Sequence, residues 1–504
     1  MKKYIYTILL LFTACVAFSQ TNFNKSWCVG TNNVYCVYFS PSPQISIYNN
    51  NDFLAFYGGN SNICDSNGNV ILATDGMSVY NNTGKYYIDN GAVLASPLFY
   101  KHDNGFNSYT QSSIFLPFED KIYYLITLDV SDSMYYNMFY PAFPNANVSP
   151  FDRLYYHKID MKENWGAGRV IEREKVIIKG DSMLKSMMTA CRHANGKDWW
   201  LVKQMYERGG YYKSKCKIAT ILVTKDSVYP PIITSFPDFL FSTYDQSGQA
   251  MFNQDGTKYA ATCRGTGKVF FADFDRCTGI FSNPKTYNVP EYSRHNPIDT
   301  TLMDQQTQGL TFSPNGQFLY VMKYYNIVQL DLNDNDSSTA WYHVAGLDTI
   351  WQQFQLYNTS YLGYDNKLYI GYVGGSSNNI SVINNPDAKG MNCNFCPKCL
   401  MFPLQGGVTT PPNMPNYDLG ESGQPCWPLG NEELTIMNDK LEVYPNPTSS
   451  KLYIKTELRD KRELYNAMGQ FILSTQANEI DVSRCSKGVY YLKCGIFIKK
   501  IIID

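Results

Sequence analysis

Phe252-Asn-Gln-Asp-Gly-Thr-Lys-Tyr-Ala260 and Phe312-Ser-Pro-Asn-Gly-Gln-Phe-Leu-Tyr320 are two copies of one pattern, 60 positions apart. Each copy has an aromatic residue, a polar turn with glycine, and then residues that favour a strand. A weaker third copy, Leu362-Gly-Tyr-Asp-Asn-Lys-Leu-Tyr369, begins 50 positions after the second. A repeat of this length, with a tight turn and several strands per copy, is typical of a β-propeller, whose blades bury their faces against one another.

Short strand-like segments elsewhere in the chain support this interpretation. They are β-branched or aromatic, and each follows a turn. These segments are Lys121–Leu128, Asp198–Lys203, Gly267–Asp273, Phe318–Met322 and Lys367–Gly371. The 41 Tyr, 28 Phe and 7 Trp also favour strands over helices. We therefore predict an all-β protein with a WD40-like β-propeller over residues 20–417, of seven blades, with six or eight as alternatives.

The last 64 residues have a different pattern. They begin Leu-Glu-Val-Tyr-Pro-Asn-Pro-Thr-Ser-Ser-Lys-Leu-Tyr-Ile (441–454), continue with Glu-Leu-Tyr-Asn-Ala-Met-Gly-Gln (463–470), and finish with Lys-Gly-Val-Tyr-Tyr-Leu-Lys (487–493) and Lys-Lys-Ile-Ile-Ile (499–503). This series resembles the type A C-terminal sorting domain of the bacterial type IX secretion system. The motif positions are Tyr444, Pro445, Asn446, Pro447, Asn466, Gly469, Gln470, Gly488 and Tyr490.

The resemblance implies a small Ig-like β-sandwich over residues 441–504, recognised by the type IX translocon of the outer membrane and often cleaved there. Pro-rich residues 418–440 are then expected to be a linker. The implied location is secreted or on the cell surface, reached through the periplasm.

The N-terminus agrees with export. Lys2 and Lys3 precede the apolar run Ile5–Phe12, and Ala17-Phe18-Ser19 has the small residues of a cleavage site. We predict a signal peptide over residues 1–19. Phe12-Thr13-Ala14-Cys15 resembles a degraded lipoprotein box, so lipidation of Cys15 remains the alternative. No other stretch reaches the roughly 18 apolar residues of a spanning helix, so we predict no transmembrane segment.

Several segments of the propeller region resemble the large secreted propellers of gliding bacteria, over residues 33–417. They include Cys64-Asp-Ser-Asn-Gly-Asn69, Tyr155-Tyr-His-Lys-Ile-Asp-Met161 and His193-Ala-Asn-Gly-Lys-Asp-Trp-Trp200. The resemblance implies architecture and location, because that family has no general activity to carry over.

The charge of the chain is nearly balanced, with 43 basic and 44 acidic residues. Without Lys2 and Lys3 the basic count is 41, and 41 − 44 gives a net charge of −3. Such a balance gives no long-range attraction to phosphate backbones, so no nucleic-acid partner is expected.

Thirteen of the 14 cysteines follow the predicted signal peptide, and export favours disulfides over free thiols. Spacing predicts that three pairs bridge locally: Cys263 with Cys277, Cys485 with Cys494, and Cys28 with Cys36. The cluster Cys393, Cys396 and Cys399, with Cys426 downstream, also predicts disulfides. Zinc or an iron–sulfur cluster is the alternative for this cluster, but we expect neither a metal nor another cofactor.

No catalytic motif is found in the sequence, and we assign no catalytic residue. The leading hypothesis is a non-catalytic binding or adhesion protein that holds a glycan or protein ligand with its propeller loops, such as residues 129–152. The alternative is a polysaccharide hydrolase or lyase in which carboxylates such as Asp65, Asp75 and Asp89 converge at the propeller's central mouth.

Overall fold

The structure is a computed structural model, and the residues it describes do not form one unbroken range. They are 22–31, 33–40, 42–49, 54–103, 105, 107–139, 151–206, 214–241, 248–290, 306–336, 339–346, 356–373, 377–403, 407, 410–423, 426, 441–456, 461–466, 471–494 and 497–504. The predicted signal peptide, Cys15 and most of the predicted linker lie outside them. Residues 1–423 and 424–504 form two compact units. No helix in the described part of the chain is long and apolar enough to cross a membrane.

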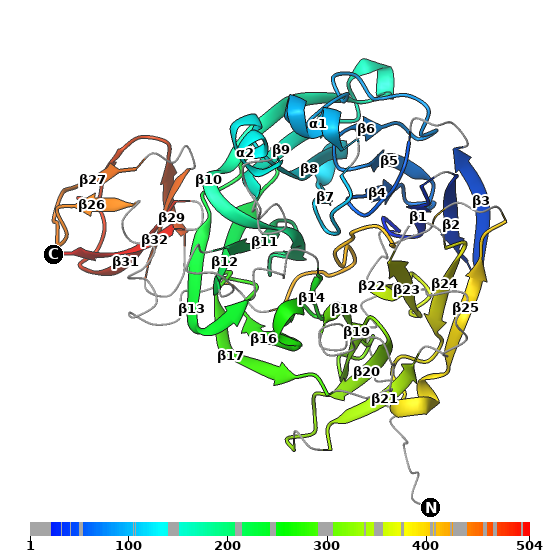
Figure 1. The fold of residues 1–504 in the computed structure, drawn as a ribbon. Coiled ribbons are helices and arrows are strands. Elements are labelled where there is room, and N and C mark those ends of the chain that lie inside the picture. The colour runs from blue at the N-terminus through cyan, green and yellow to red at the C-terminus, as the bar shows by residue number, and fades with distance from the viewer. Residues whose placement is uncertain are drawn as a thin grey trace, which may run out of the picture. The chain divides into compact units, whose positions relative to one another are not determined.

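The described residues of the first unit form a β-propeller of seven antiparallel blades around a common centre (Figure 1). Blades 1 and 2 have three strands each. They consist of β1 Ser26–Val29, β2 Val34–Phe39 and β3 Pro43–Asn49, and of β4 Ser61–Cys64, β5 Val70–Thr74 and β6 Val79–Tyr80. Blades 3 and 4 share one seven-stranded sheet. Its strands are β7 Ser113–Pro117, β8 Ile122–Asp129, β9 Phe151–Asp160, β10 Arg169–Arg192, β11 Trp199–Tyr206, β12 Ser214–Val223 and β13 Ile232–Phe241.

Blades 5, 6 and 7 are four-stranded sheets. Blade 5 has β14 Ala250–Phe252, β15 Lys258–Cys263, β16 Lys268–Phe274 and β17 Phe281–Asn288. Blade 6 has β18 Thr307–Phe312, β19 Phe318–Lys323, β20 Asn326–Asp331 and β21 Trp341–Gly346. Blade 7 has β22 Leu356–Leu362, β23 Leu368–Val373, β24 Asn379–Ile383 and β25 Phe395–Met401. The strand segments predicted from sequence are confirmed as β8, β11, β16, β19 and β23.

The long strand β10 joins blades 3 and 4. Its first half, from Arg169 to Lys179, pairs with β9, and its second half, from Met188 to Arg192, pairs with β11. The register shifts several times along β10, which lets one strand serve as the outer strand of one blade and the inner strand of the next.

The repeated turn has the same place in consecutive blades, between the first and second strands. In blade 5 the Gly256 N–H donates to the Asn253 carbonyl, and in blade 6 the Gly316 N–H donates to the Ser313 carbonyl. Gly256 and Gly316 have φ angles of 74° and 73°, which glycine adopts without steric cost. The repeated sequence pattern is therefore the turn from the inner strand to the next strand of a blade.

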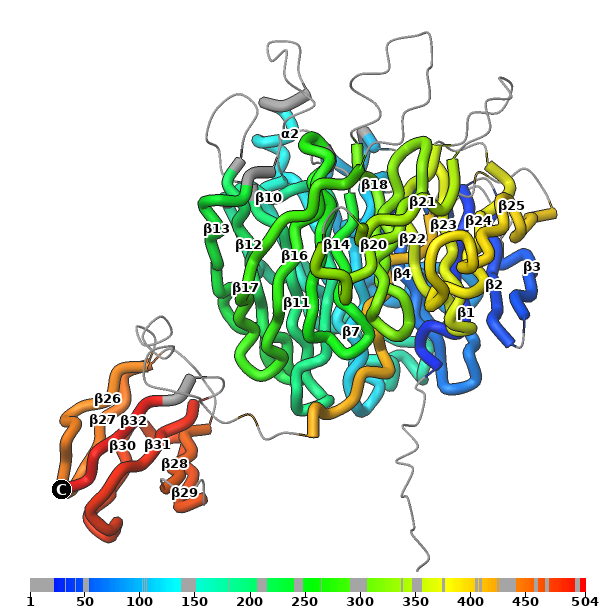
Figure 2. Tube along the Cα trace, turned by 90° about the horizontal axis from the view of Figure 1, so that it is seen from below, coloured from blue at the N-terminus to red at the C-terminus, as the bar shows by residue number. Residues whose placement is uncertain are grey.

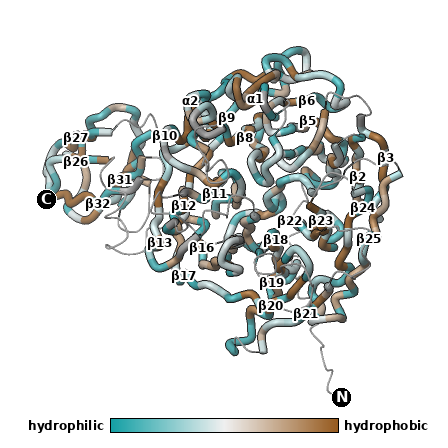
Figure 3. Tube along the Cα trace, in the orientation of Figure 1, coloured by the Kyte–Doolittle hydropathy of each residue, from teal (hydrophilic) through white to brown (hydrophobic). Residues whose placement is uncertain are grey.

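The hydrophobic core lies between neighbouring blades. Tyr320 and Met322 of blade 6 pack in one cluster with Tyr357 and Ile370 of blade 7, and all four are buried. Each large side chain buried in this way contributes about 1.5–3 kcal/mol relative to leaving it exposed. Figure 3 shows hydrophobic residues at α1 and along β23.

Two short helices lie on one face of the propeller: α1, Pro97–His102, and α2, Asp132–Phe139. Their side chains Phe99 and Tyr135 are buried in the core. Four 3₁₀ turns complete the helical elements of the described residues: Glu119–Lys121, Asn164–Gly166, Arg264–Thr266 and Gly390–Cys393.

Residues 410–420, which we name the axial segment, pass through the centre of the ring and leave on the face opposite α2 (Figure 2). The unit boundary lies after residue 423, so residues 418–423, expected to begin the linker, belong to the propeller unit.

The second unit contains two antiparallel sheets. One consists of β26 Glu442–Tyr444, β27 Lys451–Lys455 and β30 Glu479–Asp481, and the other of β29 Phe471–Thr475, β28 Arg462–Asn466, β31 Gly488–Cys494 and β32 Phe497–Ile503. Alternate residues of β27, Leu452 and Ile454, are buried with Leu464 and Leu492 of the other sheet. This is the small β-sandwich expected from the sequence.

Candidate functional site

The centre of the propeller is occupied by Asn413 of the axial segment. Its backbone N–H donates to the Asn60 carbonyl at 2.9 Å, and its own carbonyl accepts from Ser61 Oγ at 2.8 Å. Its side-chain amide donates to the Ser113 carbonyl at 2.9 Å and to the Met188 carbonyl at 3.0 Å. One buried residue thereby ties together blades 2, 3 and 4.

Polar side chains of the inner strands complete this network. Tyr361 Oη of blade 7 donates to Asn413 Oδ1 at 3.3 Å. Gln111 Nε2 donates to the Ala250 carbonyl at 2.9 Å, and Gln111 Oε1 accepts from the Ala250 N–H at 2.8 Å, which links blade 5 to the chain leading into blade 3. These groups are bonded to one another and to the axial segment, so the centre is a structural network.

Tyr417 anchors the axial segment further along. Its hydroxyl donates to the Phe115 carbonyl at 3.0 Å, and its ring meets Trp199 edge-on at 5.9 Å. Burial raises the pKa of Tyr417 well above its ordinary value, so the phenol keeps its proton. Local sequence patterns do not record this role, because the partners of Tyr417 come from the distant strands β7 and β11.

The three carboxylates considered for a central mouth do not converge. Asp65 lies in the turn between β4 and β5 and accepts backbone N–H groups of that turn. Asp75 directly follows β5 and therefore lies at the opposite end of that strand. Burial raises the pKa of Asp75 to about 6, and Tyr80 Oη donates to it at 2.7 Å. Asp89 pairs with Arg169 at 2.5 Å. Each carboxylate stabilises its own turn or strand contact, which corrects the expectation that they meet at the mouth.

A cavity of 340 Å³ lies instead beside the two helices, and we name it the rim pocket. Its walls come from the start of α1, the end of β8, the first turn of α2, and β9 and β10. The lining residues are Leu94, Ala95, Ser96, Pro97, Asp129, Asp132, Ser133, Arg153, Tyr155 and Glu174.

Asp129 is the most deeply buried charged group of the rim pocket, with 1% of its surface exposed. Its carboxylate accepts hydrogen bonds from the Ser96 N–H at 3.2 Å and from Ser96 Oγ at 3.3 Å. Burial raises the pKa of Asp129 to about 7, against the lowering effect of these bonds and of Arg153. Near neutral pH this carboxyl group therefore exists in both protonation states.

Arg153 is the cross-strand partner of Asp129 in the β8–β9 register. Its Nη1 donates to Tyr155 Oη at 2.9 Å, two residues along the same strand and hence on the same face. Its Nε is buried and has no hydrogen-bond partner among the described residues. A buried guanidinium donor without a partner is costly, and a bound acceptor would satisfy it.

Glu174 is held at the pocket by a bulge in β10. Its backbone N–H donates to Nδ1 of the buried His157 at 3.1 Å, and His157 Nε2 lies 2.9 Å from Thr127 Oγ1. Because Nδ1 accepts, the imidazole proton is on Nε2 and donates to Thr127. Burial lowers the pKa of His157 to about 3, so this neutral form persists across the physiological range.

The first turn of α2 is fixed by carboxylates. Ser131 Oγ accepts from the Met134 N–H at 3.2 Å as an N-cap, and the buried Asp152 accepts from both Ser131 N–H and Ser131 Oγ at 2.7 Å. Asp132 Oδ1 accepts the Leu98 N–H at 3.0 Å and ties α2 to α1. Both helices that wall the rim pocket are thus held in place by side chains.

The rim pocket lies at the two ends of the 129–152 insertion. Asp129 and Asp132 begin the 129–152 insertion, and Arg153 follows its end directly. Residues 140–150 of this insertion lie outside the described residues. Composition identified the insertion, whereas the register that sets Asp129 opposite Arg153 depends on strand pairing.

The structure places the predicted local cysteine pairs differently from the spacing argument. Cys263 is at the start of the turn from β15 to β16, and Cys277 follows β16 at its other end, so they do not face each other across a hairpin. Cys485 and Cys494 likewise lie at opposite ends of β31. Cys263, Cys485 and Cys494 are thiols in the structure. The spacing was misread because each pair flanks one strand, not two.

Three further observations concern the other cysteines. Cys28 and Cys36 are direct cross-strand partners and are thiols here, so their disulfide stays a prediction. Cys396 and Cys399 form a disulfide with Cα atoms 5.7 Å apart, while Cys393 is a buried thiol. Cys277 and Cys426 are each disulfide-bonded.

Several sorting-motif residues have structural roles in the second unit. Asn446 Nδ2 donates to the Lys500 carbonyl at 2.7 Å, and Asn446 Oδ1 accepts from the Ile502 N–H at 2.8 Å. Tyr490 Oη donates to the Ser486 carbonyl at 2.8 Å. Tyr444 is 52% exposed, and its ring stacks on Tyr453 at 6.0 Å.

The remaining motif positions are placed as follows. Pro445 and Pro447 follow β26, Asn466 ends β28 and Gly488 begins β31, whereas Gly469 and Gln470 lie outside the described residues.

Residues 442–504 match the family model of the secretion system C-terminal sorting domain. The second unit is therefore a type IX sorting domain, which marks proteins for export to the cell surface or the extracellular space. No curated protein matches the chain.

Solved structures with similar folds are distant in sequence. A provisionally assigned 6-phosphogluconolactonase from Bacteroides fragilis is 11% identical with a TM-score of 0.40, covering 78% of this chain and 97% of its own. The periplasmic gluconolactonase of Pseudomonas aeruginosa is 11% identical with a TM-score of 0.35, covering 77% and 97%. Hsv2 of Kluyveromyces lactis is 10% identical with a TM-score of 0.37, covering 72% and 90%.

Proposed function

We propose that this chain is an exported, non-catalytic binding protein whose propeller holds a hydroxyl-rich ligand, a glycan, in the rim pocket. The sorting domain supplies the route to the cell surface. The observation that carries the proposal is Arg153, which lines a cavity of 340 Å³ and whose buried Nε lacks a hydrogen-bond partner among the described residues.

The chemistry of the pocket walls suits sugar hydroxyls. Carboxylates such as Asp132 and Glu174 accept hydrogen bonds from hydroxyl groups, and the guanidinium of Arg153 donates to hydroxyl or ring oxygens. Tyr136 follows Ser133 by three positions on α2 and is 53% exposed, so it offers an aromatic face on the same side of the helix. Hydrogen-bonding groups next to an exposed ring are a common arrangement for holding a sugar.

The centre of the ring supports placing the site at the rim. Asn413 and Tyr417 fill the centre with internally bonded groups, so a ligand there would have to displace the axial segment. Loops on a rigid scaffold are also the usual place for binding residues.

The test is a glycan screen with the full exported chain, followed by titration of any glycan that binds. Arg153→Gln should weaken binding at least tenfold. Lys268→Gln, with the same loss of charge at an exposed position of β16 in blade 5, should bind like the wild type. Equal affinity of all three proteins for every bound glycan would remove the rim pocket from the account.

A hydrolase or lyase that uses the same pocket is the second candidate, and one observation favours it. The pKa of Asp129, raised to about 7, suits a general acid or base near neutral pH, and further carboxylates line the same cavity. Release of reducing ends from a bound polysaccharide, abolished by Asp129→Asn, would establish this candidate and exclude the non-catalytic one.

A further inference from the structure

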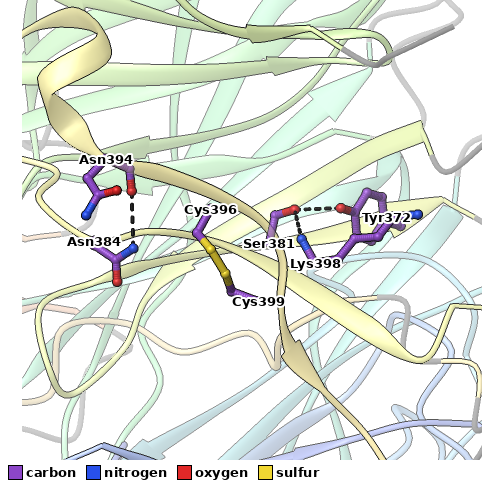
Figure 4. The surroundings of a disulfide bond; sticks show 7 residues. All are labelled: Tyr372, Ser381, Asn384, Asn394, Cys396, Lys398 and Cys399. Carbon is purple, nitrogen blue, oxygen red and sulfur yellow. Dashed lines mark hydrogen bonds between the residues drawn. A yellow bond between two sulfur atoms is a disulfide. The ribbon is translucent and has the colours of Figure 1, made fainter.

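The Cys396–Cys399 disulfide lies on β25, the outermost strand of blade 7 (Figure 4). The register of the β24–β25 pair shifts between Ile380 and Val382, opposite this part of β25. Lys398, between the two cysteines, has a φ of 55°. Side chains three residues apart in a regular strand point to opposite faces, so the shift and the left-handed residue are what bring the two sulfurs together.

The loop that carries the disulfide is held by other bonds. The Lys398 N–H donates to Ser381 Oγ at 3.0 Å, and Ser381 Oγ lies 2.5 Å from the hydroxyl of the buried Tyr372 (Figure 4). On the preceding side, Asn384 Nδ2 donates to the Asn394 carbonyl at 3.2 Å. These bonds do not involve sulfur, so opening the disulfide leaves the loop anchored.

The disulfide is also accessible and closes a very short loop. Cys399 is exposed and Cys396 is partly exposed, whereas Cys393, three residues earlier, is buried. A loop with only two intervening residues restricts the unfolded chain little, so such a bond adds little to stability. A disulfide that contributes little to stability and faces solvent is suited to exchange.

We propose that Cys396–Cys399 is a thiol–disulfide exchange site for an external thiol. The thiolate attacks Sγ of exposed Cys399, the bond between the two sulfurs breaks, and Cys396 leaves as a thiolate that takes up a proton. The product is a mixed disulfide at Cys399. A second external thiolate then attacks the external sulfur of this mixed disulfide, and Cys399 leaves as a thiolate that takes up a proton. In total, two external thiols are oxidised to one disulfide, and the protein disulfide is reduced to two thiols.

The surroundings of the pair favour this direction of attack. Lys398 lies between the two cysteines in the sequence and carries a positive charge, which favours thiolates on nearby cysteines. The outer edge of β25 has no strand partner in the described part of the fold, so an extended segment with a cysteine has backbone groups to pair with. Cys393 does not compete, because burial raises the pKa of its thiol.

The experiment uses the full exported chain and glutathione as the probe. Native protein is incubated with reduced glutathione at pH 8, quenched with an alkylating reagent and analysed by peptide mass spectrometry. We expect glutathione on Cys399 and alkylation of Cys396, with no alkylation of Cys393. The thermal midpoint should stay within about 1 °C of that of the untreated protein, because a short loop contributes little to stability.

Two variants keep the proposal testable. Cys396→Ser leaves Cys399 as a thiol and should take up glutathione from oxidised glutathione, while Cys393→Ser should exchange like the wild type. If the disulfide opens only in denaturant, or if Cys393 becomes alkylated at the same rate as Cys396, the pair is a structural bond and the proposal is wrong.

Discussion

Asp129 and Arg153 stand directly opposite one another on β8 and β9, and they differ in how their polar atoms are satisfied. The Asp129 carboxylate is bonded by Ser96, whereas Arg153 Nε has no partner among the described residues. The Asp129 carboxylate therefore has its hydrogen-bond donors within the protein, whereas Arg153 is the residue at which we propose that a ligand binds.

Asp129 should make the protein less stable as pH rises. Its pKa is raised to about 7 in the folded state, against about 4 in the unfolded chain, so the unfolded state loses its proton first. Between those values the folded state binds more protons, and stability falls with increasing pH by about 4 kcal/mol over the whole interval.

Asp129→Asn removes this dependence. In urea denaturation, the loss of stability between pH 4.5 and pH 8 should be smaller in Asp129→Asn than in the wild type. Asp238→Asn, on the exposed surface of β13, should lose as much stability over this interval as the wild type. An identical pH dependence in the wild type and Asp129→Asn would show that this carboxyl group titrates normally.

His157 should have the opposite effect at acid pH. Its pKa is lowered to about 3, so below its ordinary value near 6.5 the unfolded state is protonated first and stability falls as the pH decreases. His157→Gln, which keeps a donor and an acceptor, should reduce the loss of stability between pH 6.5 and pH 4. Denaturation curves at both pH values test this, and an undiminished loss in the variant would contradict it.

Asn413→Ala should destabilise the propeller by about 2–4 kcal/mol, because it leaves the Ser113 and Met188 carbonyls buried without their donor. Asn416→Ala, which removes bonds from the same segment to the partly buried Gln254, should cost about 1 kcal/mol. Thermal or urea unfolding measures both. Equal small losses would mean that the axial segment does not hold the blades together.

The repeated turns were predictable from sequence, and the axial segment was not. Gly256 and Gly316 sit in local patterns, because a tight turn needs its special backbone angles within a few residues. Asn413 has partners from blades that are hundreds of residues apart, and no local pattern records them. Its neighbours Pro411, Pro412 and Pro415 fall within the predicted propeller range 20–417, and the tertiary structure buries them.

The sequence indicated the insertion beside the rim pocket but not the residues that line it. The long insertion after Asp129 indicated a binding loop, since propeller strands are normally joined by shorter turns. The pairing of Asp129 with Arg153 depends on the register of β8 and β9 across that insertion. The spacing argument for Cys263 with Cys277 and for Cys485 with Cys494 was wrong for a related reason. Two cysteines that flank one strand can have the same spacing as two cysteines that face each other across a hairpin.

Removal of residues 441–504 should stop export. The sorting domain is a separate compact unit, so the truncated propeller should still fold and should accumulate in the periplasm. Immunoblots of periplasmic and extracellular fractions make the comparison, with Tyr453→Phe in the full chain as a conservative control. Normal amounts of the truncated chain outside the cell would show that export does not need this domain.

The most direct measurement is a crystal structure of the full exported chain with a glycan identified by the screen. The account predicts glycan density in the rim pocket between α1 and α2, with a glycan oxygen within hydrogen-bonding distance of Arg153 Nε. Glycan density elsewhere on the propeller, with the rim pocket holding only water and Arg153 unchanged, would contradict it.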